Sequence, residues 1–382
     1  MTAALWTTVS AGGRAVARSA SACTWEVAVR PVLKSGLRLL WRDAATVQLG
    51  VDARHAVVLE RLDPSVTATL ELLDGTRTLD EVVAAAARVG LAAADTTALL
   101  ALLRRNGALD DATAPPPGLP AAERDRLAPD VAGLGLVHRE PGAGVAALRR
   151  RRGAAVLVLG TGRIGSAAAS LLAAAGVGTL LLRDDADATR ADALPGGLRA
   201  TDAGRPRVVA AAEAATSAGQ VHVDAAVRAA DGSDCAVADA ALIAPAAGGV
   251  PGRAALELLA ATQLPHLLAT VRETCGTVGP FVVPGRTSCP RCHDLHRAER
   301  DRDWPAVAAQ LAVPSRGDVA AGESALCAAV AAWRRASCSP GSTRPARRSR
   351  STPRSRFGCR SGPCGAAPGG PTRAAAACAS PR

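Results

Sequence analysis

The sequence has no tyrosine and only two phenylalanines and five tryptophans, so aromatic side chains make up 2% of its 382 residues. Proteins that bind single-stranded nucleic acid stack bases on aromatic side chains, and this scarcity disfavours that class. Lysine is nearly absent too, because Lys34 is the only one among 45 Lys+Arg. Together with the abundance of alanine, this bias indicates a GC-rich coding sequence rather than a function.

Acidic residues are missing from positions 334–382, which hold 11 arginines. The whole chain has 45 Lys+Arg against 34 Asp+Glu, so removing those 11 leaves 34 basic and 34 acidic residues for positions 1–333. The formal net charge of +11 therefore lies in a basic tail that we expect to be disordered. The neutral body lacks the basic surface of a nucleic-acid-binding domain.

Long apolar runs are missing as well, which disfavours a membrane-spanning helix. Residues 1–25 lack the continuous apolar segment of a secretory signal. We therefore expect residues 1–29 to be a disordered extension or the product of a start codon placed too early. The ten cysteines show no disulfide-framework spacing, which favours a reduced, cytoplasmic protein with no membrane partner.

Residues 30–113 have the pattern of a winged-helix-like α+β domain. The runs TVQLG and HAVVLERL flank Asp52–Arg54 and predict a hairpin, and Thr78 with Glu81 forms a capping box at the start of a helix. The helices expected over 64–73, 78–90 and 93–105 carry few basic residues, which disfavours DNA binding. An exposed strand edge can instead pair with a peptide. A small domain with no such role is the alternative, and residues 114–152 are expected to be a linker.

A strand–loop–helix–strand pattern opens the next domain, expected over 153–333. The strand AAVLVLG leads into Gly160-Thr-Gly162-Arg-Ile-Gly165, a helix and the strand GTLLLR. This is the βαβ unit of a Rossmann-like fold, in which the glycines bring the backbone close to a phosphate at a helix N-terminus. The acid after the second strand, Asp184 or alternatively Asp185, is placed to bind a ribose. The alternative is a loop that keeps this shape and binds nothing.

Cys289 and Cys292 lie in a turn flanked by proline and glycine. Two thiolates at this spacing can share one structural zinc ion, which needs four ligands. A partner pair is not evident, because Cys359 and Cys364 in the tail have a different spacing, although His293 and His296 lie nearby. The alternative is a pair of free thiols.

Several stretches together resemble the ThiF/MoeB/HesA-like E1 superfamily, and more closely its cyclodehydratase-type proteins of thiazole/oxazole-modified, bacteriocin-like peptide biosynthesis. RPVLKSGLRLLWRDAATVQLGVD and LLDGTRTLDEV are similar to that subgroup's leader-peptide-binding winged helix. GTGRIGS, DALPGGLRATDAGRPR and VGPFVVPGRTSCPRCHDLHRAERDRDWPAVAAQL are similar to its E1-like domain. The resemblance implies an α/β chain with an ATP site that adenylates a C-terminal carboxylate, and a homodimer.

Carried over by position, Gly160, Gly162 and Gly165 would face the phosphates and Asp184 the ribose. Arg207 stands where active members keep a phosphate-binding lysine, and the two side chains are not equivalent. The Asn-x-x-Arg element reads Asp192-Ala-Leu-Pro195, and the acidic turn that holds Mg²⁺ reads Ala244-Pro-Ala-Ala-Gly248. Adenylyl transfer depends on cations and metal that clamp charge, so we expect a degenerate ATP site.

Three functions follow from this pattern. The favoured one is a scaffold that binds a leader peptide and presents the precursor to a YcaO-type cyclodehydratase. The alternative is an ATP-dependent ThiF-type adenylyltransferase, related to ubiquitin-like modifier-activating enzymes, that acts on a carrier-protein C-terminus. A Rossmann-type oxidoreductase is the least favoured, because GTGRIGS is followed by E1-like sequence.

The tail over 334–382 departs from the resemblance, since relatives would continue with a helix, closing strands and a second cysteine pair. Its Arg, Ser, Pro and Gly composition cannot bury enough apolar area to fold. We hypothesise that the reading frame shifts near Trp333, which would remove half of the zinc ligands. The alternative is a genuine basic tail that binds nucleic acid or acidic surfaces.

Overall fold

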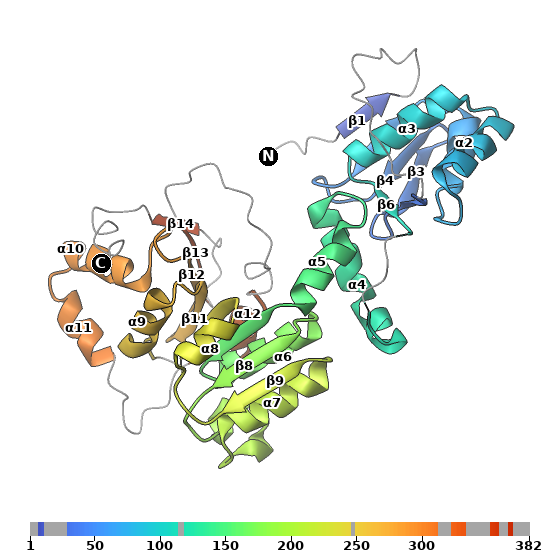
Figure 1. Cartoon of the computed structure of the whole chain (residues 1–382). Helices are drawn as coiled ribbons and strands as arrows, with labels where there is room; N and C mark the ends of the chain where they lie inside the picture. Colours follow the sequence, from blue (N-terminus) through green and yellow to red (C-terminus); the bar gives the residue numbers. More distant parts are fainter. Residues whose placement is uncertain are drawn as a thin grey trace. The chain divides into compact units, whose positions relative to one another are not determined.

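The computed structural model describes residues 7–10, 29–113, 118–245, 249–311, 322–333, 352–358 and 366–369. The chain divides into two compact units, Met1–Arg149 and Arg150–Arg382, which can be followed in Figure 1 by the colour change along the sequence. Within these described ranges, no helix is both long enough and apolar enough to cross a membrane.

The first unit contains a small sheet in the order β1-β5-β4-β3. The antiparallel pairing of β4 (Thr46–Leu49) with β5 (Val57–Glu60) confirms the predicted hairpin. β3 (Leu39–Asp43) pairs with the other side of β4. β1 (Thr7–Ser10) pairs in parallel with the outer edge of β5, although the sequence predicts disorder there. Strand pairing uses backbone groups that every non-proline residue carries, so composition alone does not exclude it.

Three helices cover this sheet's apolar side, as the sequence predicts. They are α1 (Pro64–Glu71), α2 (Leu79–Arg88) and α3 (Ala93–Arg105). The Thr78 hydroxyl accepts the Glu81 backbone N–H, and the Glu81 carboxylate accepts that of Thr78, which confirms the capping box at α2. Leucine and valine side chains from helices and strands form one core, which includes Val47, Leu49, Val57, Leu59, Leu70, Val82, Leu100 and Leu103. A two-stranded sheet of β2 (Pro31–Leu33) and β6 (Leu109–Asp111) also belongs to this unit.

The segment expected to be a linker is largely helical. α4 (Ala121–His138) and α5 (Ala143–Arg152) occupy most of it. Leu119, Leu127 and Leu148 are buried against one another, and this apolar contact explains why the segment folds. Their spacing in the sequence follows no regular helical period, which is why the pattern did not reveal it.

Lys34 ties α4 to the small sheets. Its side chain is 3% exposed, and its Nζ donates hydrogen bonds to the carbonyl oxygens of Gly135 and Arg139, both at 2.6 Å. These carbonyls belong to the end of α4, where backbone acceptors lack partners within the helix. Burial lowers the pKa of Lys34 below its ordinary value, against the opposing field of Asp110.

The described part of the second unit forms an eight-stranded sheet in the order β14-β13-β12-β11-β10-β7-β8-β9. The strands from β11 to β9 run parallel, and β12 turns back antiparallel to β11, as the Rossmann-like prediction requires. The strands are β7 (Ala155–Leu159), β8 (Thr179–Arg183), β9 (His222–Ala226), β10 (Ala240–Ile243), β11 (His266–Arg272), β12 (Cys275–Val282), β13 (Thr352–Gly358) and β14 (Ala366–Gly369).

Helices cover both faces of this sheet. On one face, Val156, Val158, Leu180 and Leu182 pack against α6, α7 and α12. On the other, residues of the opposite parity, such as Leu157 and Leu181, join an apolar cluster with α8 and α9. This alternation explains why the strands are apolar throughout. The helices are α6 (Arg163–Ala174), α7 (Arg207–Ala218), α8 (Gly232–Val237), α9 (Arg253–Ala261), α10 (Pro290–Arg300), α11 (Trp304–Leu311) and α12 (Ser324–Trp333).

Two strands of this sheet, β13 and β14, belong to the basic tail for which the sequence predicts disorder. β13 pairs antiparallel with β12, and β14 with β13. As with β1, the pairing is made through the backbone at an open sheet edge. The rest of positions 334–382 lies outside the described residues.

Candidate functional site

The glycine loop lies at the carboxyl end of β7, where ligands of open α/β sheets bind. Gly160 has a φ of +87°, and a Cβ there would stand 2.3 Å from the Ala244 carbonyl oxygen. A Cβ on Gly165 would stand 1.8 Å from the Gly160 carbonyl oxygen. Gly162 is the N-cap residue of α6. Because of these close approaches, only glycine fits at positions 160 and 165. Backbone N–H groups at the start of α6 are of the kind that bind anions.

Asp184 ties this loop to the neighbouring strand. It follows β8, and its Oδ2 accepts hydrogen bonds from the Thr161 backbone N–H at 2.6 Å and from the Thr161 hydroxyl at 3.1 Å. Its Oδ1 accepts the Ala186 N–H at 3.0 Å. Asp185 is exposed. The structure therefore brings Asp184 to the loop, at the position expected for a ribose ligand, while its contact with a ribose stays a prediction.

Arg207 is the first residue of α7 and is paired with a carboxylate. Its Nε and Nη2 donate to Asp192 Oδ2 at 3.1 and 2.9 Å, and the two side chains are 14% and 11% exposed. The same Oδ2 accepts the Thr189 backbone N–H at 2.8 Å and hydroxyl at 2.9 Å. Asp192 Oδ1 lies 3.6 Å from where a Cβ on Gly162 would be. Asp192 thus lies beside the glycine loop and neutralises the charge of Arg207.

The turn expected to carry the Mg²⁺ acid follows β10. Ala244 packs its backbone against Gly160, while residues 246–248 lie outside the described residues. The sequence Ala244-Pro-Ala-Ala-Gly248 has no carboxylate. The loss of nucleotide-activating chemistry at this loop stays a prediction from the sequence.

Sequence reasoning missed a buried charge network at the end of β8. Arg183 donates to Asp234 Oδ1 from Nε at 3.0 Å and from Nη2 at 2.5 Å, and from Nη2 to Asp224 Oδ2 at 2.8 Å. The Arg183 and Asp234 side chains are 2% and 3% exposed. Arg228 also donates to Asp234. An arginine ending an otherwise apolar strand was the available signal, but its partners lie 41 and 51 residues away.

Burial alone would raise the pKa of Asp234. Hydrogen bonds from Arg183, from the Asp231 backbone N–H and from Arg228 outweigh it and lower that pKa to about 2. The network joins β8, β9 and α8, and the Arg183 carbonyl oxygen accepts the Gly160 backbone N–H at 3.0 Å. The network is therefore a structural element of the unit.

Cys289 and Cys292 are brought together at the start of α10. Cys289 is the N-cap residue, the two Sγ atoms are 3.5 Å apart, and no disulfide joins them. Within the described ranges, no group of three or more His, Cys, Asp and Glu side chains could hold a metal ion. Two thiols are half of a structural zinc site, so these residues alone do not fit the ion. Cys359 and Cys364 lie outside the described residues.

The sheet order and the glycine loop define a Rossmann-like domain of the nucleotide-binding type. The comparison with protein families matches the ThiF family over residues 139–332, slightly more than half of the chain. The chain therefore belongs to the ThiF family, and the prediction made from GTGRIGS and the stretches after it is confirmed. A comparison with curated proteins finds no match.

Solved structures show the same fold over most of the chain. E. coli MccB with MccA-N7isoASN is 14% identical, with a TM-score of 0.65 and coverage of 90% of this chain and 98% of that one. E. coli MccB alone is 15% identical, with a TM-score of 0.64 and coverage of 92% and 97%. PaaA is 15% identical, with a TM-score of 0.63 and coverage of 88% and 99%. At these identities the likeness concerns the fold.

Proposed function

We propose that this chain is a cytoplasmic peptide-binding member of the ThiF family that does not activate carboxylates itself. In this proposal it captures the leader of a ribosomally made precursor peptide and presents the peptide to a partner YcaO-type cyclodehydratase, which carries the ATP chemistry. Structures of the similar fold have been solved as MccB with MccA and as MccB with ATP. These neighbours support peptide recognition by a protein of this fold.

The Arg207–Asp192 ion pair carries the proposal. A cation that stabilises a transferring phosphoryl group must direct its charge at the phosphates. Here two guanidinium nitrogens point at one carboxylate oxygen of the same chain. A triphosphate would have to displace Asp192 and would meet its negative charge beside Gly162. The cation at the position that the resemblance assigns to a lysine is therefore already paired with a carboxylate of the same chain.

The sheet edge at β5 supports the peptide-binding role of the first unit. In the structure this edge pairs with β1 of the same chain, over four residue pairs from Thr7↔Val57 to Ser10↔Glu60. An extended segment is therefore compatible with the backbone groups of β5. Peptides recognised by strand addition use the same groups, and a leader peptide would pair with them in place of β1.

The test measures peptide binding and ATP turnover on the full chain. Precursor peptides encoded near the gene are titrated by calorimetry, and pyrophosphate release is followed with ATP, Mg²⁺ and each peptide. We expect binding without pyrophosphate release. Peptide-dependent release would establish the adenylyltransferase alternative, and no binding to any such peptide would overturn the proposal.

The proposed partner and oligomeric state have their own measurements. We propose a homodimer, as the resemblance implies, and light scattering on the full chain checks it. Copurification of the neighbouring YcaO-type protein with the full chain, with and without the bound peptide, checks the partner. A stable monomer that never retains the YcaO-type protein would contradict both points.

A further inference from the structure

The second unit has a pocket that the proposed function does not use. It has a volume of about 550 Å³ and lies between α6, the loop over residues 193–199 and the end of α7. Ser170, on α6, is eight residues beyond Gly162, which corresponds to about 12 Å along the helix axis. None of the residues that line the pocket belongs to the glycine loop, and its volume falls in the range of small-ligand sites.

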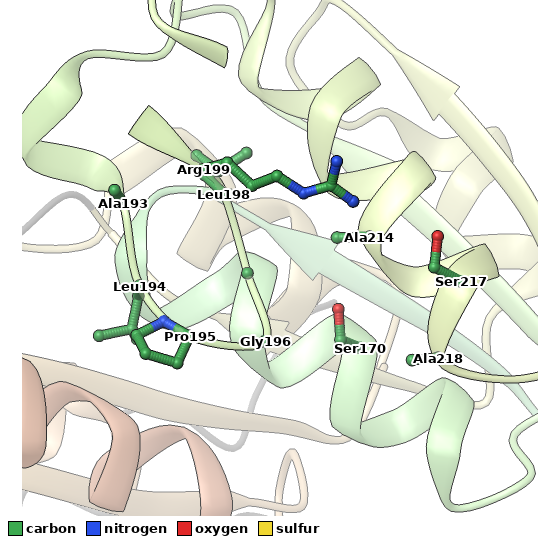
Figure 2. Close-up of a pocket in the computed structure, with 11 residues that line it drawn as sticks. Ser170, Ala193, Leu194, Pro195, Gly196, Leu198, Arg199, Ala214, Ser217 and Ala218 are labelled. Atoms are coloured by element: carbon green, nitrogen blue, oxygen red, sulfur yellow. The ribbon is translucent and has the colours of Figure 1, made fainter. Parts of the chain in front are cut away.

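A buried hydroxyl without a partner lies in the wall of this pocket. Ser170 is 5% exposed, and in the part of the chain that the structure describes its Oγ has no hydrogen-bond partner. Figure 2 shows this hydroxyl directed from α6 toward the space between the loop and α7. A buried hydroxyl without a hydrogen bond costs about 1–3 kcal/mol, so a ligand that satisfies it gains that interaction.

The arginine Arg199 also lines this pocket. Arg199 is exposed, and Figure 2 shows its side chain reaching from the loop across the pocket toward Ala214 on α7. Glu213 on α7 is held by Arg205, through both carboxylate oxygens. The hydrogen bond from Arg205 lowers the pKa of the Glu213 carboxyl, and the positive charge of Arg199 also acts on this group and contributes to the lowering. Arg199 is the charged residue among those that line the pocket.

The rest of the wall is apolar except for Ser217, whose hydroxyl donates to the Glu213 carbonyl oxygen at 2.7 Å. Leu194, Pro195, Leu198, Ala214 and Ala218 contribute to it. The chain passes close to α6 because Gly197 has no side chain: a Cβ there would stand 2.5 Å from Ser166 Oγ. One cation, one buried hydroxyl and an apolar wall suit a single charged group on an aliphatic body. A phosphate would require more charged donors than the one arginine supplies.

We propose that this pocket binds an aliphatic carboxylate, with the carboxylate near Arg199 and hydrogen-bonded to the Ser170 hydroxyl. The aliphatic part packs on the leucine, proline and alanine side chains. The same chemistry occurs in a free short-chain acid and in the C-terminal residue of a peptide. The site is independent of the peptide-presenting role, because it uses neither β5 nor the glycine loop.

The test uses the full chain with four probes, observed by saturation-transfer NMR and calorimetry. Hexanoate and hexanamide represent the free acid and its neutral analogue, and N-acetyl-Ala-Leu is used as the acid and as the amide. We expect an acid to bind and its amide to bind at least about tenfold more weakly, as expected for loss of a charged hydrogen bond. Tighter binding of the peptide acid than of hexanoate identifies a peptide C-terminus as the source, and the reverse identifies a free acid.

Variants then locate the binding. Arg199→Gln should weaken it about tenfold or more and Ser170→Ala by up to about tenfold, while Ala214→Leu should fill the pocket and abolish it. The control Arg190→Gln removes an exposed arginine from the same connection and should change nothing. Ser170→Ala should also leave the free protein equally or more stable to heat, because it removes an unsatisfied hydroxyl. No binding of either acid at 10 mM (about the weakest affinity worth assigning), or binding unchanged in all three variants, overturns the proposal.

Discussion

Position 207 shows how one neighbouring residue changes what a cation can bind. Arg207 lies at the start of α7, beside the glycine loop, as the resemblance implies. Asp192 stands where the resemblance implies an asparagine, and it forms a largely buried ion pair with Arg207. Asp202 and Arg205 form a similar pair. Asp192 and Asp202 each end a short 3-10 helix, Arg190–Asp192 and Ala200–Asp202, and Asp202 is 7% exposed and pairs with Arg205 at 3.0 Å. The chain thus offers a matched control for the first pair.

Replacing Asp192 should restore anion binding. Asp192→Asn keeps an acceptor for Thr189 but removes the charge that neutralises Arg207, so a non-hydrolysable ATP analogue should bind about tenfold more tightly. Asp202→Asn removes a similar carboxylate away from the loop and should leave the affinity unchanged. Calorimetry on both variants and the wild type makes the comparison. Equal affinities of all three proteins for the ATP analogue would show that the Asp192 charge does not weaken its binding.

At the scale of elements, the close packing of α6 on the glycine loop depends on the missing side chain of Gly165. Gly165→Ala places a Cβ 1.8 Å from the Gly160 carbonyl oxygen, so α6 or the loop must move. We expect a loss of about 2–4 kcal/mol in the free energy of unfolding. Urea unfolding measures it.

Gly232→Ala is the control for this substitution. Gly232 is also helical, at the first position of α8, and a Cβ there would meet no atom within 4 Å. It should change the free energy of unfolding by less than about 1 kcal/mol, and toward stability, because alanine favours the helix. A similar loss in both variants would mean that the contact at Gly160 is not the cause.

The sequence predicted the elements whose signals are local. The capping box at Thr78, the hairpin around Asp52–Arg54 and the strand–glycine-loop–helix unit each lie within a few residues, and each is confirmed. The helices α4 and α5 depend on contacts among leucines up to 29 residues apart. No periodic pattern of apolar residues predicted these two helices. The same limit applies to the site: Asp192 and Arg207 meet across 15 residues, a pairing that spacing alone does not indicate.

At the scale of the whole molecule, the net positive charge and the buried ion pairs lie in different parts of the chain. The excess of 11 positive charges lies in 334–382, where the described contacts are backbone pairings of β13 and β14. In the second unit the buried Arg183 is instead paired with the buried Asp234. Interior pairing of this kind makes the stability of the second unit depend on pH.

Asp234 should make the second unit sensitive to acid. Its pKa is about 2 in the folded chain, below the ordinary value of 3.8, so the unfolded chain takes up the proton first as the pH falls. The stabilisation, about 2 kcal/mol, is complete above pH 4 and is lost as the pH falls toward 2. Urea unfolding between pH 6 and 2 should show the gap between wild type and Asp234→Asn narrowing in this window. The control Asp185→Asn replaces an exposed acid, and its free energy of unfolding should differ from that of the wild type by a small, constant amount across this range. A constant difference for Asp234→Asn would contradict a stabilising role for the ionised Asp234.

Lys34 has a practical consequence for chemistry on the intact protein. Reagents that acylate primary amines find a single lysine in the sequence, and its nitrogen is enclosed between the last carbonyls of α4. Acylation of that nitrogen requires the first unit to open, so the rate of labelling at Lys34 reports how often the end of α4 detaches. One mass-spectrometric peak would then follow local unfolding without any introduced probe.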